Sequence, residues 1–400
     1  MKTQPEDDIM KKRFTPLATA AASALLCAGL ISPALAADIK IGVLVPLTGT
    51  SAIQGKDISR GIQLAVQQVN QGHDLAMQGG ASVKIGPDAI GGKIQLIIED
   101  TESRPASALD AMRKLVNVDK VPVVLGILSS GVCVPTGQFA QQSKVVEICS
   151  SSTSPELRKI GPYLFSTMGL DDLMGKALAD FAREDSGAKR YASLVANNPF
   201  GVGMEIQACK QLEAQEGISC TTKVRYEEGK SDYNADLRRT VSQDPGAVLF
   251  TAFGADARLM MQEAYQLGLQ TAKNWYADYP SLWVADIQKT PQIAEGIKGL
   301  EAGAGGPAYD KYAADYQQAF GEAPTSAFGG YAYDSTMLVA LAIQKAGAAT
   351  SDAIRDALIP VSQNYVGVSG AKAFDQDGMQ KSESYQPVII KDGKMVPYKK

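Results

Sequence analysis

The fold is decided by the stretch Asp38-Ile39-Lys40-Ile41-Gly42-Val43-Leu44-Val45-Pro46-Leu47-Thr48-Gly49. Its apolar run is short and continuous, which is typical of a strand buried on both faces. Behind this run, apolar residues recur at the three- and four-residue spacing of an amphipathic helix, at Ile58, Ile62, Val66 and Val69. The stretch therefore predicts a strand, a glycine-bearing turn and a helix that packs against the strand.

The same alternation continues along most of the chain. Further strands are predicted at residues 94–98, 121–125, 145–148, 191–195, 219–226 and 247–251, with helices near residues 106–118, 134–142, 203–215 and 233–241. Parallel strands need such crossover helices, which then cover both faces of the sheet. The chain is therefore predicted to be an α/β protein built from doubly wound parallel sheets.

Two regions depart from this alternation. Residues 71–92 are glycine-rich and weakly periodic, so we expect a surface loop there, with His73 as a solvated imidazole without a ligand role. Near the C-terminus, residues 385–390 and 395–398 are predicted to be short strands joined by a turn that contains Asp392-Gly393.

The first 36 residues have the pattern of an export signal. A basic cluster at residues 11–13 precedes an apolar run over residues 17–31, and Ala34-Leu35-Ala36 has the small-x-small form of a cleavage site. We expect cleavage after Ala36 and a mature protein in the periplasm. Translation from Met1 or from Met10 is compatible with this pattern.

Length and charge narrow the class of protein. The chain has 400 residues, and the part that remains after removal of the signal is too long for one hydrophobic core, so we expect two lobes. The signal contains four basic and three acidic residues, so its removal changes the net charge from −4 to −5. No basic stripe is present, which argues against nucleic-acid binding.

The cysteines predict disulfides rather than a metal site. Four remain after export, Cys133, Cys149, Cys209 and Cys220, and an even number is expected in an oxidising compartment. Three pairings are possible, and sequence proximity favours Cys133 with Cys149 and Cys209 with Cys220. Metal ligation is disfavoured because no C-x-x-C spacing occurs and the chain has a single histidine. A lipid anchor on the fifth cysteine, Cys27, is disfavoured because the residue before it is large for that processing.

Three loops that follow strands of the first series combine hydroxyl side chains with a predicted helix start. They are Thr48 to Ser51, with Gln54 beyond, Gly126 to Gly131, and Cys149 to Glu156, in which Thr153 and Glu156 have capping-box spacing. In open α/β sheets ligands bind at such loops, where free N–H groups and the positive end of the helix dipole favour an anion. Helix capping alone explains any one of these loops. Three such loops after strands of the same series, however, predict a binding site for a carboxylate.

Two loops of the second series occupy equivalent positions, Asn197 to Gly201 and Phe253 to Asp256. Phe200 offers an apolar wall to a ligand, and Asp256 offers a negative charge that can accept from an ammonium group. The alternatives are core packing for Phe200 and a helix cap for Asp256.

These residues resemble the branched-chain amino-acid-binding protein family, the type I periplasmic receptors of ABC importers. The resemblance covers essentially the whole mature chain. It is carried by residues 39–49, Gly61-Ile62-Gln63-Leu64-Ala65, Ser154-Pro155-Glu156-Leu157, Phe200-Gly201 and Gly330-Tyr331-Ala332-Tyr333-Asp334. It implies two similar lobes, joined by three crossings, that close on a small solute and deliver it to a membrane permease.

The resemblance also implies roles for individual residues. Ser130, Ser151 and Thr153 match positions that hold a ligand's α-carboxylate, and Thr153 and the Ser151 backbone also contact its amine. Asp256 falls where amino-acid binders of the family carry a glutamate for the ammonium group. Tyr233 lies near a position that assists ligand binding in the family.

Three positions depart from the family's amino-acid binders. Asp256 is the shorter acid, Phe200 replaces a tyrosine, and Gln54 stands where an aromatic residue often packs against the ligand. These departures keep the carboxylate prediction but weaken leucine, isoleucine or valine as the cargo.

We therefore expect residues 37–168 and 282–366 to form the first lobe and residues 169–281 and 367–400 the second, joined by a three-strand hinge. The predicted function is that of a periplasmic substrate-binding protein, a monomer without a cofactor. It captures a small carboxylate-bearing solute, an amino acid in the first place, for an inner-membrane ABC permease. The alternatives are a receptor for another carboxylate or an amide, and a periplasmic sensor of the same fold.

An enzyme is the competing class, and the sequence disfavours it. A hydrolase needs a nucleophile and a base within reach of one another. Here the single histidine lies in the expected surface loop, no G-x-S-x-G occurs, and the cysteines are expected in disulfides.

Overall fold

The computed structural model describes residues 38–283, 289–303 and 305–399, which contain two large β-sheets. The expected signal at residues 1–36, with its cleavage position, its two candidate start residues and Cys27, lies outside the described residues. Within the described ranges, no helix is both long and apolar enough to cross a bilayer.

The first sheet has six strands in the order β15-β7-β6-β5-β1-β4, and all of them are parallel. Their bounds are β1 (Ile39–Val45), β4 (Ile94–Asp100), β5 (Val123–Leu125), β6 (Val146–Cys149), β7 (Leu164–Gly169) and β15 (Met379–Gln380). β1 is buried along nearly its whole length, as its continuous apolar run predicts. The direction of strand addition reverses between β1 and β5, and ligands bind at such switch points in doubly wound sheets.

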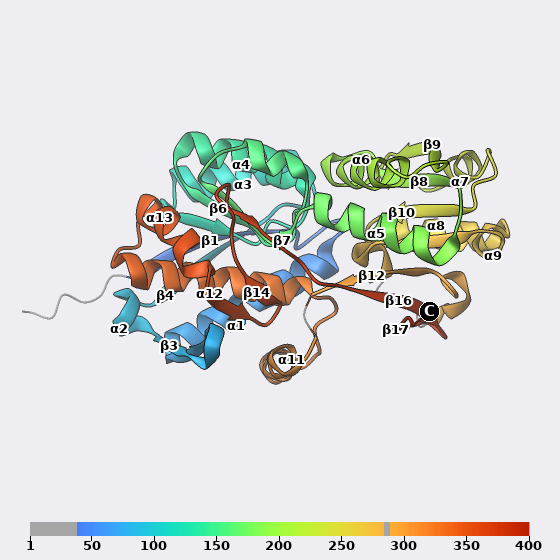
Figure 1. The fold of residues 1–400 in the computed structure, drawn as a ribbon. Helices are drawn as coiled ribbons and strands as arrows, with labels where there is room; N and C mark the ends of the chain where they lie inside the picture. The colour runs from blue at the N-terminus through green and yellow to red at the C-terminus, as the bar shows by residue number, and fades with distance from the viewer. Residues whose placement is uncertain (1–37, 284–288, 304, 400) are drawn as a thin grey trace, which may run out of the picture. The chain divides into compact units, whose positions relative to one another are not determined.

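Helices cover both faces of the first sheet (Figure 1). α1 (Ala52–Gln71), α12 (Phe328–Ala346) and α13 (Ser351–Ser362) lie on one face, and α3 (Pro105–Asn117) and α4 (Ser130–Ser143) on the other. α12 is buried on all sides over most of its length. α1 approaches it so closely that a Cβ on Gly61 would stand 2.1 Å from the carbonyl oxygen of Gly329. Only glycine at position 61 permits this contact.

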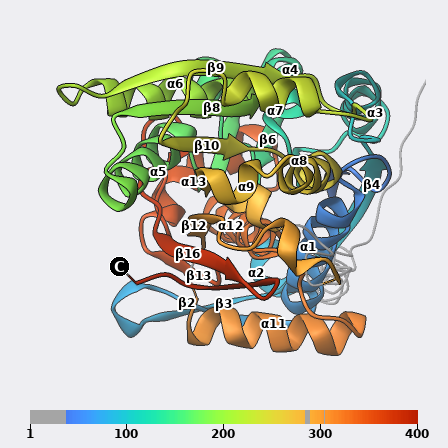
Figure 2. The same cartoon turned by 90° about the vertical axis from the view of Figure 1, so that its right-hand side faces the viewer.

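The second sheet has seven strands in the order β17-β16-β12-β11-β10-β8-β9. Figure 2 labels five of them, β9, β8, β10, β12 and β16, from top to bottom. Their bounds are β8 (Arg190–Ala196), β9 (Ser219–Tyr226), β10 (Ala247–Thr251), β11 (Asn274–Ala277), β12 (Lys298–Ala302), β16 (Tyr385–Lys391) and β17 (Lys394–Pro397). β8 to β12 are parallel and repeat the strand order of the first sheet, so a second switch point lies between β8 and β10.

Helices also cover both faces of the second sheet. α5 (Asp171–Ser186) and α6 (Pro199–Glu213) pack on one face, and α7 (Asn234–Thr240) and α8 (Gly254–Gln266) on the other. Three short helices, α9 (Leu269–Ala272), α10 (Tyr279–Leu282) and η4 (Pro291–Ile293), complete this part of the chain. The predicted C-terminal hairpin is confirmed: β16 and β17 are antiparallel, and Asp392 and Gly393 both have positive φ, as a tight hairpin turn requires.

The expected surface loop at residues 71–92 is wrong. The segment contains an antiparallel hairpin, β2 (His73–Ala76) and β3 (Ser82–Ile85), around a short η1 (Gln78–Gly80), followed by α2 (Pro87–Ile90). His73 is half-buried rather than solvated, and burial, with the nearby Lys311, lowers the pKa of its imidazole. Strands of four residues with one buried side chain each are too short to give a period in the sequence.

Sheet membership differs from the expected lobe boundaries in two places. β12 pairs with β11 and β16 in the second sheet, although residues 282–366 were expected in the first lobe. β15 pairs with β7 in the first sheet, although residues 367–400 were expected in the second lobe. The chain therefore passes between the sheets after β7, after β12 and between β15 and β16. The helix α11 (Pro307–Phe320) and the small hairpin of β13 (Tyr365–Gly367) and β14 (Gly370–Lys372) flank these passages.

Candidate functional site

A cavity of about 260 Å³ lies where the carboxyl ends of strands from both sheets meet. It is lined by residues from the loops that follow β1, β4 and β5 in the first sheet and β8, β9 and β10 in the second. These loops flank the switch points of the two sheets. The cavity is therefore placed where doubly wound sheets bind ligands, and it takes its walls from both of them.

Five helices begin at the wall of this cavity. Their lining residues are Ser51 before α1, Pro105 in the first turn of α3, Ser129 before α4, Asn198 before α6 and Phe253 before α8. The N-terminal turn of a helix carries free N–H groups and the positive end of the dipole. Together these helix starts favour an anionic group in the cavity.

Helix capping does not explain the two serines in this set. Ser51 and Ser129 both precede helices, but within the described residues neither hydroxyl accepts a capping hydrogen bond. Only Asn198 caps its helix, by accepting from the Gly201 N–H at 3.0 Å. The Ser51 and Ser129 side chains are therefore not committed to holding the helix ends.

Three of the predicted site residues lie next to the cavity, on the loops after β5 and β6. Ser130 is buried, and its Oγ accepts from the backbone N–H groups of Thr153 at 3.2 Å and Ser154 at 3.1 Å. The Ser151 Oγ donates to the Leu128 carbonyl at 3.4 Å. The Ser130 hydroxyl therefore accepts from two N–H groups of the loop that was expected to bind a carboxylate.

The expected helix cap at Thr153 is wrong. The side chain of Ser154, not that of Thr153, accepts from the Glu156 N–H at the start of η2 (Pro155–Lys159).

The other four predicted site residues lie one layer behind the lining. Phe200 is buried and stacks on Phe253, with ring centroids 5.0 Å apart, so Phe253 is the aromatic side chain that meets the cavity. Gln54 is buried, and its Nε2 would be 3.9 Å from a Cβ on the facing Gly254. These contacts place the loop before α8 directly against the first turn of α1.

Asp256 and Tyr233 support the loop after β9. The Asp256 Oδ2 accepts from the Gly229 N–H at 3.0 Å. The Tyr233 hydroxyl accepts from Lys230 N–H and donates to the Glu227 carbonyl, and burial of this phenol raises its pKa. None of the seven predicted side chains lines the cavity itself. Their roles in binding stay predictions.

Glu228 is a lining residue that the sequence argument missed. The residue is exposed, but partial desolvation of its carboxylate at the cavity wall, together with repulsion from Asp256 and Glu227, raises its pKa. The Asn198 side chain donates to it at 2.9 Å. The signal that could have found it was the position of Glu228, directly after the predicted strand at residues 219–226.

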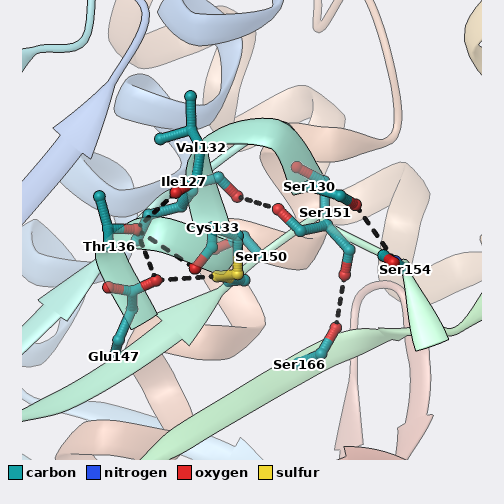
Figure 3. Close-up of a disulfide and its surroundings, with 12 residues drawn as sticks. Ile127, Ser130, Val132, Cys133, Thr136, Glu147, Ser150, Ser151, Ser154 and Ser166 are labelled. Atoms are coloured by element: carbon teal, nitrogen blue, oxygen red, sulfur yellow. Dashed lines mark hydrogen bonds between the residues drawn. A yellow bond between two sulfur atoms is a disulfide. The ribbon is translucent and has the colours of Figure 1, made fainter. Parts of the chain in front are cut away.

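Both favoured disulfides are confirmed. Cys133–Cys149 joins the first turn of α4 to the last residue of β6, and Figure 3 shows it beside the loops that carry Ser130 and Ser151. Cys209–Cys220 joins α6 to the second residue of β9, at the amino end of that strand and away from the cavity. The first disulfide therefore ties together the two loops next to the cavity.

A buried acid lies against the first disulfide (Figure 3). Glu147 is fully buried, its Oε1 accepts from the Thr136 hydroxyl at 3.0 Å, and its Oε2 has no partner among the described residues. Burial raises its pKa to about 8. Glu147, Cys133 and Cys149 also form a group with metal-ligand atoms close together, but the sulfurs bond to each other and leave no thiolate for a metal.

Glu147→Gln should stabilise the protein at alkaline pH. Because the folded-state pKa of Glu147 lies above the ordinary value, the native protein loses stability as the pH rises from about 4.5 to about 8. The variant lacks this loss, so its advantage in unfolding free energy should be near zero at pH 4 and on the order of 3–5 kcal/mol at pH 9. Urea titrations at both pH values measure it. Glu205→Gln, which breaks a 2.7 Å ion pair with Arg225, should give no such gain, and equal stability of the Glu147 variant and the native protein at pH 9 would contradict the account.

Comparisons with known proteins agree with this geometry. A model of the periplasmic binding protein family matches residues 38–394. The leucine-, isoleucine-, valine-, threonine-, and alanine-binding protein of Pseudomonas aeruginosa is 26% identical over 365 residues, which cover 90% of this chain and 92% of that protein.

Two solved structures share the fold. A leucine-binding protein from Thermotoga maritima superposes with a TM-score of 0.79 at 22% identity, over 90% of this chain and 98% of that one. A solute-binding protein of an ABC transporter from R. palustris, in complex with benzoate, superposes with a TM-score of 0.76 at 19% identity, over 90% and 95% of the two chains. At these identities the likeness extends to the fold alone.

Proposed function

Because the chain belongs to the periplasmic binding protein family, we propose that it is the substrate-binding protein of an ABC transporter. It captures a small carboxylate-bearing solute, an amino acid in the first place, between its two lobes. It then delivers this solute to a permease in the inner membrane. Export to the periplasm and action as a monomer belong to the same proposal.

The observation that carries the proposal is the cavity between the two switch points. A carboxylate there would meet the N-terminal turns of α1, α4 and α6 and the uncommitted Ser51 and Ser129 side chains. Amides and hydroxyls at helix starts bind anions without a basic side chain. The described residues that line the cavity include no lysine, arginine or histidine, so these groups are what the protein offers to a carboxylate.

Binding is coupled to closure in this proposal. Gly254, at the start of α8, lies so close to the loop after β1 that a Cβ on it would be 3.1 Å from the Thr50 carbonyl oxygen. The walls contributed by the two sheets thus touch at the cavity. A solute that contacts both walls binds the closed form better and shifts a pre-existing equilibrium toward it.

An amine-free carboxylate is the second candidate cargo, because the structurally similar R. palustris protein was solved with benzoate.

The residues that line the cavity argue against catalysis. The described residues that line the cavity include no histidine or cysteine that could form a nucleophile–base pair with its serines.

The proposal is tested by identifying the solute that co-purifies with the protein and measuring solution scattering with and without it. Mass spectrometry of the native protein supplies the solute. We expect the radius of gyration to fall when the stripped protein is saturated. An unchanged radius of gyration with a solute that binds stoichiometrically would overturn the proposal that the two lobes close on the solute.

A further inference from the structure

A second cavity, of about 320 Å³, lies at the passages where the chain crosses between the two sheets. Gly303 and Gly305 follow β12, and Gln386 is the second residue of β16, so two of the three passages contribute to its wall. Among the described residues it shares no lining residue with the solute cavity. We call it the hinge cavity.

Both halves of the fold contribute to the hinge cavity. Trp283, directly after α10, and Met395 on β17 come from the part of the chain around the second sheet. Ser326 and Ala327, directly before α12, come from the part around the first sheet, and Ser369 lies in the turn between β13 and β14. A molecule that fills the hinge cavity therefore contacts both halves and the segments that join them.

The wall of the hinge cavity is acidic. The Glu301 Oε2 accepts from the Trp283 Nε1–H at 2.7 Å, whereas its Oε1 has no hydrogen-bond partner among the described residues and is not enclosed by protein, so it is open to the cavity. A second acid, Asp57, lies behind Ser326 and accepts from its N–H at 3.0 Å and its hydroxyl at 2.7 Å. The free carboxylate oxygen of Glu301 thus lies in a region of negative charge.

Two aromatic side chains line the cavity beside Glu301. The Trp283 indole is held by its hydrogen bond to Glu301 and by an edge-to-face contact with Phe328, with ring centroids 4.8 Å apart. Burial raises the pKa of the Tyr309 phenol to about 12, and the charges of Asp57 and Glu301 add to this effect, which places the phenol near both acids. Aromatic rings attract cations over their faces.

No basic side chain neutralises Glu301. The described residues that line the hinge cavity include no lysine, arginine or histidine. The buried Lys372 donates to the Ser369 carbonyl at 3.0 Å and lowers the pKa of Asp334, a different acid. A desolvated carboxylate without a counter-ion is unfavourable, so the hinge cavity is complementary to a cation that comes from outside the protein.

We propose that the hinge cavity is a second binding site, for a small organic cation of the quaternary ammonium type, and that Glu301, Trp283 and Tyr309 hold its charge. A methylated cation needs aromatic faces, apolar contacts and one carboxylate, which this wall supplies. A metal ion fits less well because it needs several ligand atoms close together, and among the described residues Glu301 belongs to no such group. The site is separate from the solute cavity, so the inference goes beyond the proposed function.

Occupancy of the hinge cavity should be coupled to solute binding. The cation would contact the passages and both halves of the fold in the arrangement in which Gly254 and Thr50 meet at the solute cavity. It therefore stabilises that arrangement and should raise the solute affinity. By linkage, the solute should raise the affinity for the cation by the same factor.

The first test is isothermal titration calorimetry of the purified protein with choline and with 3,3-dimethylbutan-1-ol, which has the same shape without the charge. We expect choline to bind about tenfold or more tightly than the alcohol, because only choline pairs with Glu301 and attracts the aromatic rings. Equal binding of the two, or no binding of choline or tetramethylammonium at millimolar concentration, would overturn the inference.

The second test separates the hinge cavity from the solute cavity. Gly131→Phe places a ring in the solute cavity, and this variant should bind choline with native affinity. In the native protein, saturation with the co-purified solute should strengthen choline binding about threefold or more. Competition between choline and the solute, or loss of choline binding in Gly131→Phe, would refute a separate site, and an unchanged choline affinity would refute the coupling. The Gly131→Phe result does not depend on the solute, so failure of the proposed function leaves this test intact.

Two variants test the wall itself. Glu301→Gln keeps an acceptor for Trp283 but removes the charge, so choline affinity should fall about tenfold or more, to that of the alcohol, while the Tm should not fall. Tyr309→Leu should weaken choline binding and leave the alcohol unaffected. Glu205→Gln is the control, because this buried acid pairs with Arg225 and does not line the hinge cavity, so choline affinity should stay native. Native choline affinity in Glu301→Gln, with or without a lower Tm, would refute the assignment.

The pH dependence gives an independent readout. Burial raises the pKa of Glu301 to about 8, so the empty site is largely protonated at lower pH and the cation binds the ionised form. Choline affinity should therefore be about tenfold or more weaker at pH 6 than at pH 9, and that of the alcohol should not change in this way. The groups that face Glu301 are Trp283 after α10 and the Tyr309 phenol on α11, which titrates above this range, with Asp57 of α1 behind the wall. A flat choline profile would contradict the proposal.

Discussion

Gly131→Phe is expected to abolish solute binding and leave the protein folded. Gly131 lies in the first turn of α4 and lines the cavity. A Cβ at this position would meet nothing closer than the Ser129 Oγ at 3.7 Å, so the new ring can enter the cavity without displacing the backbone. An aromatic ring fills a large part of a 260 Å³ space, and we expect an affinity loss of about 100-fold or more.

The measurement is calorimetric titration with the co-purified solute, together with thermal unfolding to verify the fold. Gly131→Ala is the matched control, because a single methyl fits the available space, and its affinity should stay within about threefold of the native value. Native affinity in Gly131→Phe would show that the solute binds elsewhere.

The second large effect is expected from removing the Cys133–Cys149 disulfide by a double change to serine. This disulfide anchors the loop that starts α4 to the loop that follows β6, and Ser130, Thr153 and Ser154 form their hydrogen bonds between these two loops. Its loss should lower the unfolding free energy by about 2–4 kcal/mol. It should also weaken solute binding about tenfold, because the loops must then be ordered when the solute binds.

The double change of Cys209 and Cys220 to serine is the control. That disulfide closes a loop of similar size, with a sequence separation of 11 against 16, but it lies at the amino end of β9, away from the cavity. We expect a comparable loss of stability without a loss of affinity. Equal affinity losses in the two double variants, measured where both are folded, would contradict a specific role for the first disulfide.

The sequence predicted the central parallel strands well because they are buried on both faces. Ile39 to Val45 is β1, and the predicted strand at residues 247–251 coincides with β10; both are buried along nearly their whole length. The predicted strand at residues 219–226 also coincides with β9, although this edge strand is mostly exposed or half-buried. Very short strands and strands at the passages between the sheets left no such pattern. β12 reads Lys298-Gly299-Leu300-Glu301-Ala302 and β15 has two residues, so nothing in the sequence marked where the chain changes sheets.

The loops of the site were predictable, and the side chains that line it were not. Strand ends identify the loops, since parallel strands bring their carboxyl ends to one edge. Which residue of a loop faces the cavity depends on the first turn of the following helix: Ser129 and Gly131 line the cavity, while Ser130 turns back to Thr153 and Ser154.

The crystal structure of the protein with its co-purified solute tests the central claim most directly. The account predicts the solute in the space between the loops after β1 and β5 and those after β8 and β10. Its carboxylate should lie at the helix starts around the cavity. A solute bound outside this space, or bound in it with its carboxylate away from the helix starts, would contradict the account.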